Sequence, residues 1–174
     1  MPKALPSRLE TLQKACPDYT FNVNPAACPA PSRVGTATAS TPILASPLTG
    51  PAYFVSHGGA KFPELIVVLS GDGVSVQLDG ETFINGATGI TSSTFRSIPD
   101  VPVSTFQLSL PEGPYSALAA PGGKLCQSKL SMPTAFTAQN GLVVHQSTPI
   151  AVTGCAKHRV KHKKAKKINK RKKK

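Results

Sequence analysis

The chain has 174 residues and a formal net charge of +12, and only 16% of its residues are charged. This length is sufficient for one domain with a buried core. No apolar run approaches 18 residues, which excludes a transmembrane helix, and the first residues lack the apolar stretch of a signal peptide.

The net charge is concentrated at one end of the chain. Residues 1–155 contain all 8 acidic residues and 8 of the 20 basic ones, so this part is neutral overall. The remaining basic residues are Lys157, Arg159, Lys161, Lys163, Lys164, Lys166, Lys167, Lys170, Arg171, Lys172, Lys173 and Lys174. Residues 156–174 are therefore expected to be a disordered Lys-rich tail, because they repel one another and offer little to bury.

Four cysteines fall into two groups along the chain. Their spacings do not include the C-x2-C of a zinc ribbon. The even number predicts two disulfides, Cys16–Cys28 and Cys126–Cys155, in which each cysteine pairs with its nearer neighbour, and it favours an oxidising compartment. Free thiols in the cytosol are the alternative.

The N-terminal segment predicts a short helix. Ser7 and Glu10 have the spacing of a capping box, in which a hydroxyl and a carboxylate three residues later satisfy the first backbone amides. Leu9, Leu12 and Cys16 would then share one helical face.

Residues 65–78 predict the β-hairpin to which the other strands are added. Residues 65–69 are five apolar residues, too few for a buried helix, and indicate a strand buried on both faces. Ser-Gly-Asp-Gly at 70–73 is typical of a turn. Residues 74–79 alternate apolar and polar side chains, as in a strand with one exposed face.

Further strands are predicted at residues 33–41, 52–55, 90–95 and 105–110, with Phe106, Leu108 and Leu110 facing inward in the last. The prolines and glycines between 42 and 51 are interpreted as a connection.

The last strands of the domain are predicted around Asn140-Gly141. Residues 135–139 and 142–146 flank this dipeptide, which favours a two-residue hairpin turn with φ above zero at both positions. A separate strand is expected at 150–152.

Together these elements predict an all-β fold, a sandwich-like or partly open barrel of about 8–10 short antiparallel strands with a short N-terminal helix. We divide the chain into a Cys-stapled helical segment (1–32), a β-sandwich-like domain (33–155) and the basic tail (156–174).

Several long phrases resemble one family. They are LPSRLETLQKAC, NPAACPAPSRVGTA, PLTGPAYFVSHGGAKFPELIVVL, GITSSTFRSIPDVP, YSALAA, MPTAFTAQNG and STPIAVTGC, followed by the Lys-rich tail. They are similar to the C-terminal β-rich region of a functionally uncharacterised family of large exported actinobacterial proteins. The resemblance implies an exported chain with upstream domains and supplies no catalytic residue or ligand.

Catalytic chemistry has weak support in the sequence. His57-Gly58-Gly59 is similar to an esterase oxyanion loop, but no serine has the G-x-S-x-G frame of that fold. A small hydrolase would need His57 or His145, with Asp72, Asp79 or Asp100, and we treat it as the weaker alternative to a non-enzymatic protein.

No metal site or cofactor is expected, because the carboxylates are scattered and the tail's His158 and His162 have cationic neighbours. The tail predicts nonspecific binding of polyanions. We therefore expect a secreted or cell-surface structural or adhesive module that binds anionic cell-wall polymer or a membrane surface. The alternative is a cytosolic nucleic-acid-binding protein that uses the same tail.

Overall fold

The computed structural model describes residues 1–2, 5–120 and 125–152. The strands in this part are β1 (Cys16–Pro17), β2 (Arg33–Ser40), β3 (Leu48–Ser56), β4 (Glu64–Gly71), β5 (Val74–Ile84), β6 (Thr91–Phe95), β7 (Thr105–Ser109), β8 (Leu130–Thr137) and β9 (Val143–Ile150). The helices are α1 (Leu9–Leu12) and α2 (Asp18–Val23), with 3-10 turns at Pro25–Ala27, Ala30–Ser32 and Leu125–Gln127. None of these helices is long and apolar enough to cross a membrane.

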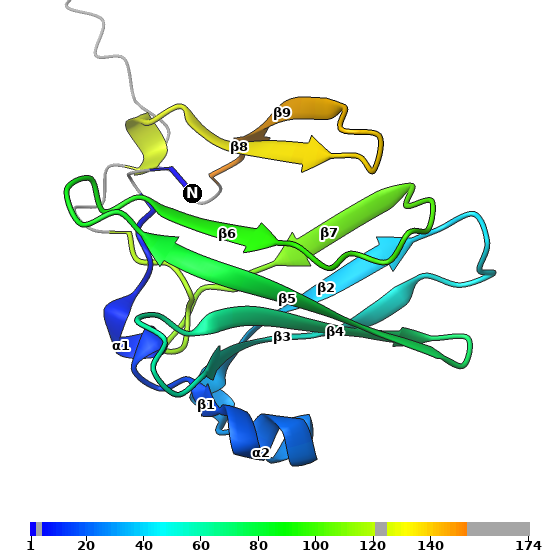
Figure 1. The fold of residues 1–174 in the computed structure, drawn as a ribbon. Helices are drawn as coiled ribbons and strands as arrows, with labels where there is room; N and C mark the ends of the chain where they lie inside the picture. Colours follow the sequence, from blue (N-terminus) through cyan, green and yellow to red (C-terminus); the bar gives the residue numbers. More distant parts are fainter. Residues whose placement is uncertain (3–4, 121–124, 153–174) are drawn as a thin grey trace, which may run out of the picture.

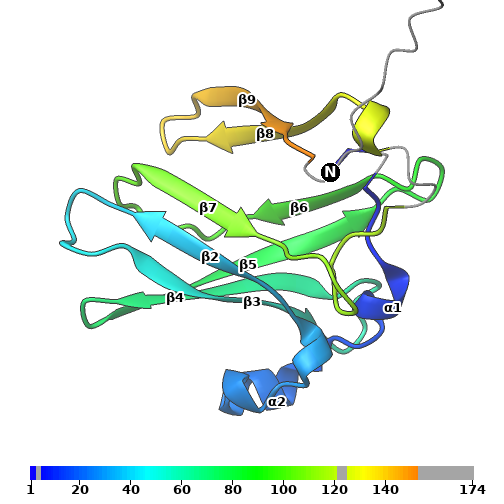
Figure 2. The same cartoon turned by 180° about the vertical axis from the view of Figure 1, so that it is seen from behind.

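Seven strands form one sheet in the order β6-β5-β4-β3-β2-β7, with β1 added beside β3. Neighbouring strands along this order are antiparallel, and β1 runs parallel to β3. The sheet curls into a half-barrel, with α2 on one side and the β8–β9 hairpin across the other, above β6 and β7 (Figures 1 and 2). The predicted all-β fold is confirmed, in its partly open barrel form.

The predicted central hairpin is confirmed as β4 and β5, which are paired from Leu65 opposite Gly80 to Gly71 opposite Val74. Its turn has positive φ at Asp72 (49°) and Gly73 (76°), the conformation that matches the twist of the flanking strands. The Asp72 carboxylate also accepts a hydrogen bond of 2.9 Å from the backbone amide of Ser46, which fixes the turn against the β2–β3 connection.

The two faces of β4 lie in separate apolar cores, as expected for a strand covered on both sides. Leu65, Val67 and Leu69 belong to the larger core, together with residues of β2, β3 and β5. Ile66 belongs to a second core with Phe21 of α2 and other residues of β1 and β3. The half-barrel interior is therefore filled by one core, and α2 closes the other face of the sheet.

Residues 47–51, predicted as a connection, belong largely to β3, and this part of the prediction is wrong. Pro51 is accommodated in the ladder opposite Thr36 of β2. At Gly50 the neighbouring strand comes so close that an added Cβ would fall on the carbonyl oxygen of Val68. Glycine is needed there for a close backbone approach within a strand, not for a turn.

Gly50→Ala is therefore expected to destabilise the protein by about 1–3 kcal/mol, because the methyl group would push β3 away from β4. The matched control is Gly86→Ala, since a Cβ at Gly86 meets no atom within 4 Å. Urea unfolding of both variants measures the difference, and equal midpoints would contradict the close approach.

The capping box predicted at the N-terminus is not formed. The N-cap of α1 is Arg8 and it makes no side-chain cap. Ser7 instead donates its hydroxyl to Thr91 Oγ1 at 3.0 Å, and Leu9 is 64% exposed. Leu12 and Cys16 are buried, but the predicted shared helical face is wrong, because α1 ends at Leu12 and Cys16 lies on β1. Long-range contacts of residues 5–8 thus replace the local cap.

These contacts tie the N-terminal segment to a distant part of the chain. Ser7 forms an antiparallel bridge with Leu118, and the backbone amide of Arg8 donates to the carbonyl of Ala117 at 2.9 Å. Thr11 donates its hydroxyl to the carbonyl of Ser116 at 2.8 Å. Residues 1–32 therefore belong to the packing of the β-domain as well as carrying the helices.

β7 is an edge strand of the sheet, and its burial differs from the prediction. Leu108 and Leu110 pack against the larger core, but Phe106 is 46% exposed. The alternation of apolar residues was interpreted correctly as a strand. Phe106 is opposite Ala39 of β2 and stays partly exposed on this edge strand.

The C-terminal hairpin is confirmed as β8 and β9, but its turn differs. Only Gly141 has positive φ (81°), and a turn closed by the Gly141 amide on the Ala138 carbonyl spans residues 138–141. Asn140 contributes through its side chain, which accepts from the Leu142 amide. The strand expected at 150–152 is not separate, because Ile150 is the last residue of β9.

Candidate functional site

His57 lies between two carboxylates at one end of the sheet. Its Nδ1 is 3.7 Å from Asp18 Oδ2 and its Nε2 is 3.3 Å from Glu64 Oε2. All three side chains are about one-third exposed, at 34%, 40% and 31% respectively. Nε2 is buried and makes no hydrogen bond among the described residues, so Glu64 is near enough for an ion pair without being aligned as an acceptor.

Strand pairing explains this arrangement. β1 and β3 are paired in parallel with Pro17 opposite Ser56, so the next residues, Asp18 and His57, leave the sheet together. Glu64 begins β4 opposite Val55 of β3. Asp18 thus comes from a distant part of the chain, whereas His57 and Glu64 lie at the two ends of the β3–β4 connection.

The chemistry available to this cluster is limited. In the described part of the chain His57 contacts Asp18 and Glu64, and no hydroxyl is hydrogen-bonded to it. A hydrolase would need a nucleophile within hydrogen-bond reach of the histidine. When protonated, His57 can link α2 to the sheet, and at this exposure such ion pairs contribute about 0–1 kcal/mol each.

The other residues considered for a catalytic set lie apart from His57 in the fold. Asp72 is in the β4–β5 turn, and Asp79 accepts a 2.8 Å hydrogen bond from Gln77 on β5. Asp100 lies in the β6–β7 connection, and His145 is on β9 opposite Ala135. The sequence did not identify Asp18 and Glu64 as the partners of His57, because nothing in it predicts the two-residue strand β1.

The first predicted disulfide is confirmed. Cys16 on β1 is bonded to Cys28, with 5.4 Å between their Cα atoms, and it closes the segment that contains α2. Cys126 is also disulfide-bonded. Cys155 lies outside the described residues, so the pairing of Cys126 with Cys155 stays a prediction.

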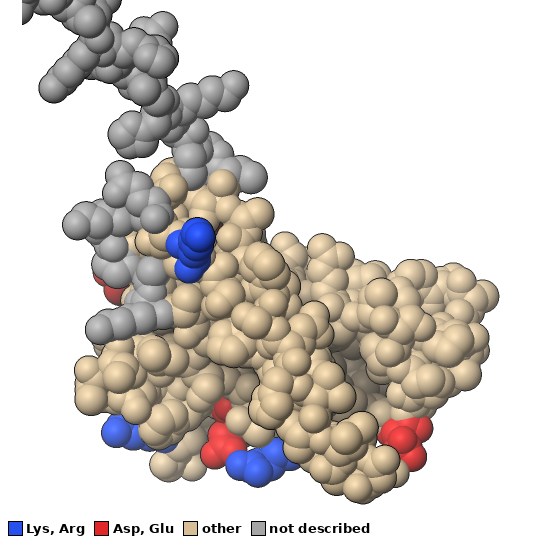
Figure 3. Space-filling view, turned by 90° about the horizontal axis from the view of Figure 1, so that it is seen from above, with Lys and Arg blue, Asp and Glu red and all other residues tan. Residues whose placement is uncertain are grey.

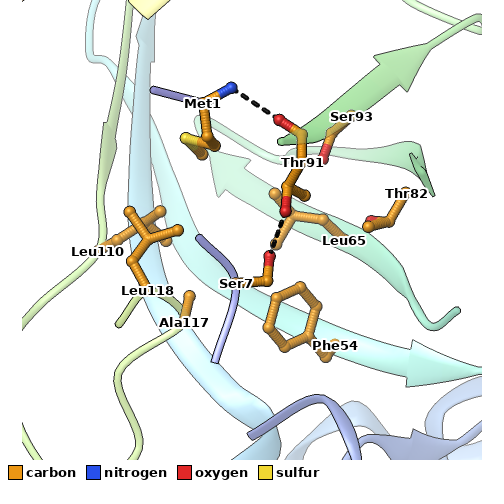
Figure 4. A pocket seen from close by; sticks show the side chains of 10 residues that line it. All are labelled: Met1, Ser7, Phe54, Leu65, Thr82, Thr91, Ser93, Leu110, Ala117 and Leu118. Carbon is orange, nitrogen blue, oxygen red and sulfur yellow. Dashed lines mark hydrogen bonds between the residues drawn. The ribbon is translucent and has the colours of Figure 1, made fainter. Parts of the chain in front are cut away.

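A small hollow lies inside the half-barrel (Figure 4). It is lined by Met1, Ser7, Phe54, Leu65, Thr82, Thr91, Ser93, Leu110, Ala117 and Leu118. The Met1 amino group donates to the Thr91 carbonyl at 2.7 Å, and its partial burial lowers its pKa. The volume is about 20 Å³, enough for roughly one water molecule and too small for an organic cofactor.

The residues predicted to bind polyanions, from Lys157 to Lys174, lie outside the described residues, as do His158 and His162. Within the part that the structure describes, no group of three or more His, Cys, Asp or Glu side chains could hold a metal ion.

No protein-family model, curated protein or solved structure matches the chain. The resemblance to large exported actinobacterial proteins therefore stays a prediction.

Proposed function

We propose that the protein is a non-enzymatic, exported β-domain that acts as a surface- or cell-wall-associated structural or adhesive module. Its basic segment, residues 157–174, binds anionic polymers or an anionic membrane surface without sequence specificity. The observation that carries this proposal is the division of charge, with a neutral body and a net charge that resides entirely in the last eighteen residues.

The body offers little long-range attraction for a polyanion. Arg8 is paired with Glu10 at 3.0 Å and Arg96 with Glu81 at 3.3 Å, both on the surface. Basic residues neutralised in this way contribute weakly to a distant field. Polyanion binding is thus assigned to the C-terminal segment alone.

The compartment is inferred from the cysteines. The Cys16–Cys28 disulfide is compatible with an oxidising environment, where such bonds persist. This favours a cell-surface polyanion over the nucleic acid of the alternative cytosolic role.

Truncation after Cys155 is the test. The shortened chain is expected to fold with an unchanged melting temperature and to lose nearly all affinity for duplex DNA and for a teichoic-type polymer, because twelve cations are removed. Fluorescence anisotropy with labelled polymers measures both affinities, and thermal unfolding monitored by circular dichroism checks the fold.

Undiminished binding by the truncated chain would overturn the proposal and place the ligand site in the β-domain. Hydrolytic activity of the full chain that disappears with His57→Ala or His145→Ala would instead support the enzyme alternative.

A further inference from the structure

The tip of the β8–β9 hairpin exposes a group of apolar side chains. Phe136 is 52% exposed, Leu142 60%, Val143 45% and Val144 52%. We refer to these four residues as the hairpin tip. Scattered apolar residues are normal on a protein surface, but a contiguous group at the end of a projecting ribbon marks an interaction site.

The register of the hairpin places these side chains on both of its faces. Phe136 is opposite Val144, and the next pair is Thr137 opposite Val143. Successive cross-strand pairs point to opposite faces of a ribbon. A hairpin that packed one face on a core would keep polar residues on the other. The tip exposes apolar side chains on both faces, Phe136 and Val144 on one and Val143 on the other, as expected for an element that contacts apolar material on both sides.

A second loop extends this surface. Ile98 and residues 137–140 line opposite sides of a hollow of about 470 Å³ between the hairpin and the β6–β7 connection. Ile98 is 54% exposed, and Val101 and Val103 farther along the same connection are 42% and 49% exposed. Two neighbouring loops therefore present branched apolar side chains at the same end of the molecule.

Charged groups are scarce on this surface. Residues 130–152 contain no Asp, Glu, Lys or Arg, with His145 as the titratable side chain of the hairpin. Asp100 lines the hollow, and its carboxylate would oppose an anionic partner. The face that carries β8 and β9 is covered mostly by uncharged residues (Figure 3).

The basic segment follows this hairpin directly in the chain. Lys157 lies seven residues beyond Ile150, the end of β9. The hairpin is about 26 Å long at 3.3 Å per residue, while eighteen residues can extend to about 60 Å. The basic segment is therefore longer, when extended, than the hairpin that it follows in the sequence.

We infer that the hairpin tip inserts into the interface of an anionic lipid bilayer while residues 157–174 bind the headgroups. Apolar side chains without nearby charge can leave water for the acyl boundary, and a basic segment adds attraction to anionic lipid, the two signals that together give stable peripheral anchoring. A soluble polyanion would use the cations and leave the hairpin tip in water. This inference rests on the proposed function and specifies its partner.

Tryptophan fluorescence tests insertion directly, because the chain has no tryptophan of its own. In the full chain, the emission of Leu142→Trp is expected to shift to shorter wavelength on vesicles of phosphatidylglycerol and phosphatidylcholine, and to be quenched by brominated lipid. Phe83→Trp is the matched control, because Phe83 is 59% exposed on β5 and outside the hairpin. The emission of Phe83→Trp is expected to stay at the same wavelength and to be unaffected by brominated lipid. Adding DNA is expected to leave the emission wavelength of both tryptophan variants unchanged.

The double variant Phe136→Thr with Val144→Thr keeps strand-compatible side chains and removes apolar surface. It is expected to weaken binding to the anionic vesicles about tenfold or more, and most clearly at 0.5 M salt, where the cations are screened. The affinity of the double variant for DNA is expected to be unchanged. The control variant Phe83→Thr is expected to bind the vesicles as tightly as the unmodified chain does.

The outcomes separate this inference from the proposed function. Vesicle binding by the full chain without a Leu142→Trp shift would overturn the insertion and leave the polyanion-binding role standing. A shift that grows with protein concentration in the absence of lipid would also overturn it, in favour of contact between copies of the chain. Failure of the full chain to bind any polyanion would overturn the proposed function itself.

Discussion

Val67→Asp is expected to unfold the domain or to leave it only marginally stable. Val67 is fully buried in the middle of β4, opposite Leu78 on β5 and Ala52 on β3. A carboxylate at this position would be surrounded by the larger apolar core, without a partner. Burying an unpaired charge destabilises by several kcal/mol, which is comparable to the total stability of about 5–15 kcal/mol.

Ser75→Asp on the partner strand is the matched control. Ser75 is exposed on β5 opposite Ser70, so its substitution is expected to change stability by less than about 0.5 kcal/mol. Urea unfolding followed by circular dichroism measures both variants. The loss at Val67 should also shrink toward acidic pH, because a protonated Asp is easier to bury than its anion. Similar midpoints for the two variants would mean that the faces of the hairpin are assigned wrongly.

The central hairpin could be predicted because its signals are local. Alternation in residues 74–79 and the turn residues Asp72 and Gly73 are each determined within a few positions, and the structure has them as β5 and its turn. The same holds for Asn140-Gly141, where the hairpin was found even though the form of its turn differs. Local chemistry was sufficient to find these two hairpins.

Long-range pairing explains the predictions that were wrong. Ser7 had the sequence of a helix cap, but the hydroxyl of Thr91, 84 residues away, takes its hydrogen bond. Gly50 has the sequence of a loop residue, and it is in a strand because β4 passes directly beside it. The helix α2 was missed, since Asp18–Val23 follows a proline and buries only Phe21.

The candidate sites also divide into one that local sequence predicts and others that depend on long-range packing. The basic segment is evident from composition alone, because it needs no partner from elsewhere in the chain. The cluster at His57 was not predictable, since its carboxylates reach it through the parallel β1–β3 pair and the β3–β4 connection. The apolar hairpin tip could not be predicted either. Alternating apolar and polar residues predict a strand, but they do not show which of its faces stays exposed to solvent.

Binding of the full chain to duplex DNA or wall polymer is expected to fall by about three to five decades between 50 and 200 mM salt. This steepness follows if roughly six to ten phosphates are neutralised, since each neutralised phosphate releases counterions from the polymer. No base sequence should be preferred, because binding through phosphates carries no sequence information. Anisotropy titrations with two unrelated duplexes across this salt range give both the slope and the preference.

A variant with fewer cations measures how much of the polyanion binding comes from the basic segment. Replacing Lys163, Lys164, Lys166 and Lys167 with Gln should lower the slope of log affinity against log salt by about one for each phosphate that is no longer neutralised, hence by up to about four. The matched control removes cations from the body, with Lys14→Gln and Lys61→Gln, and should leave the slope unchanged because these residues lie outside the basic segment. A slope that follows the body residues instead would assign phosphate binding to the β-domain. Binding that resists salt in both variants would point to a ligand recognised by shape and hydrogen bonds, since counterion release cannot produce an affinity that is independent of salt.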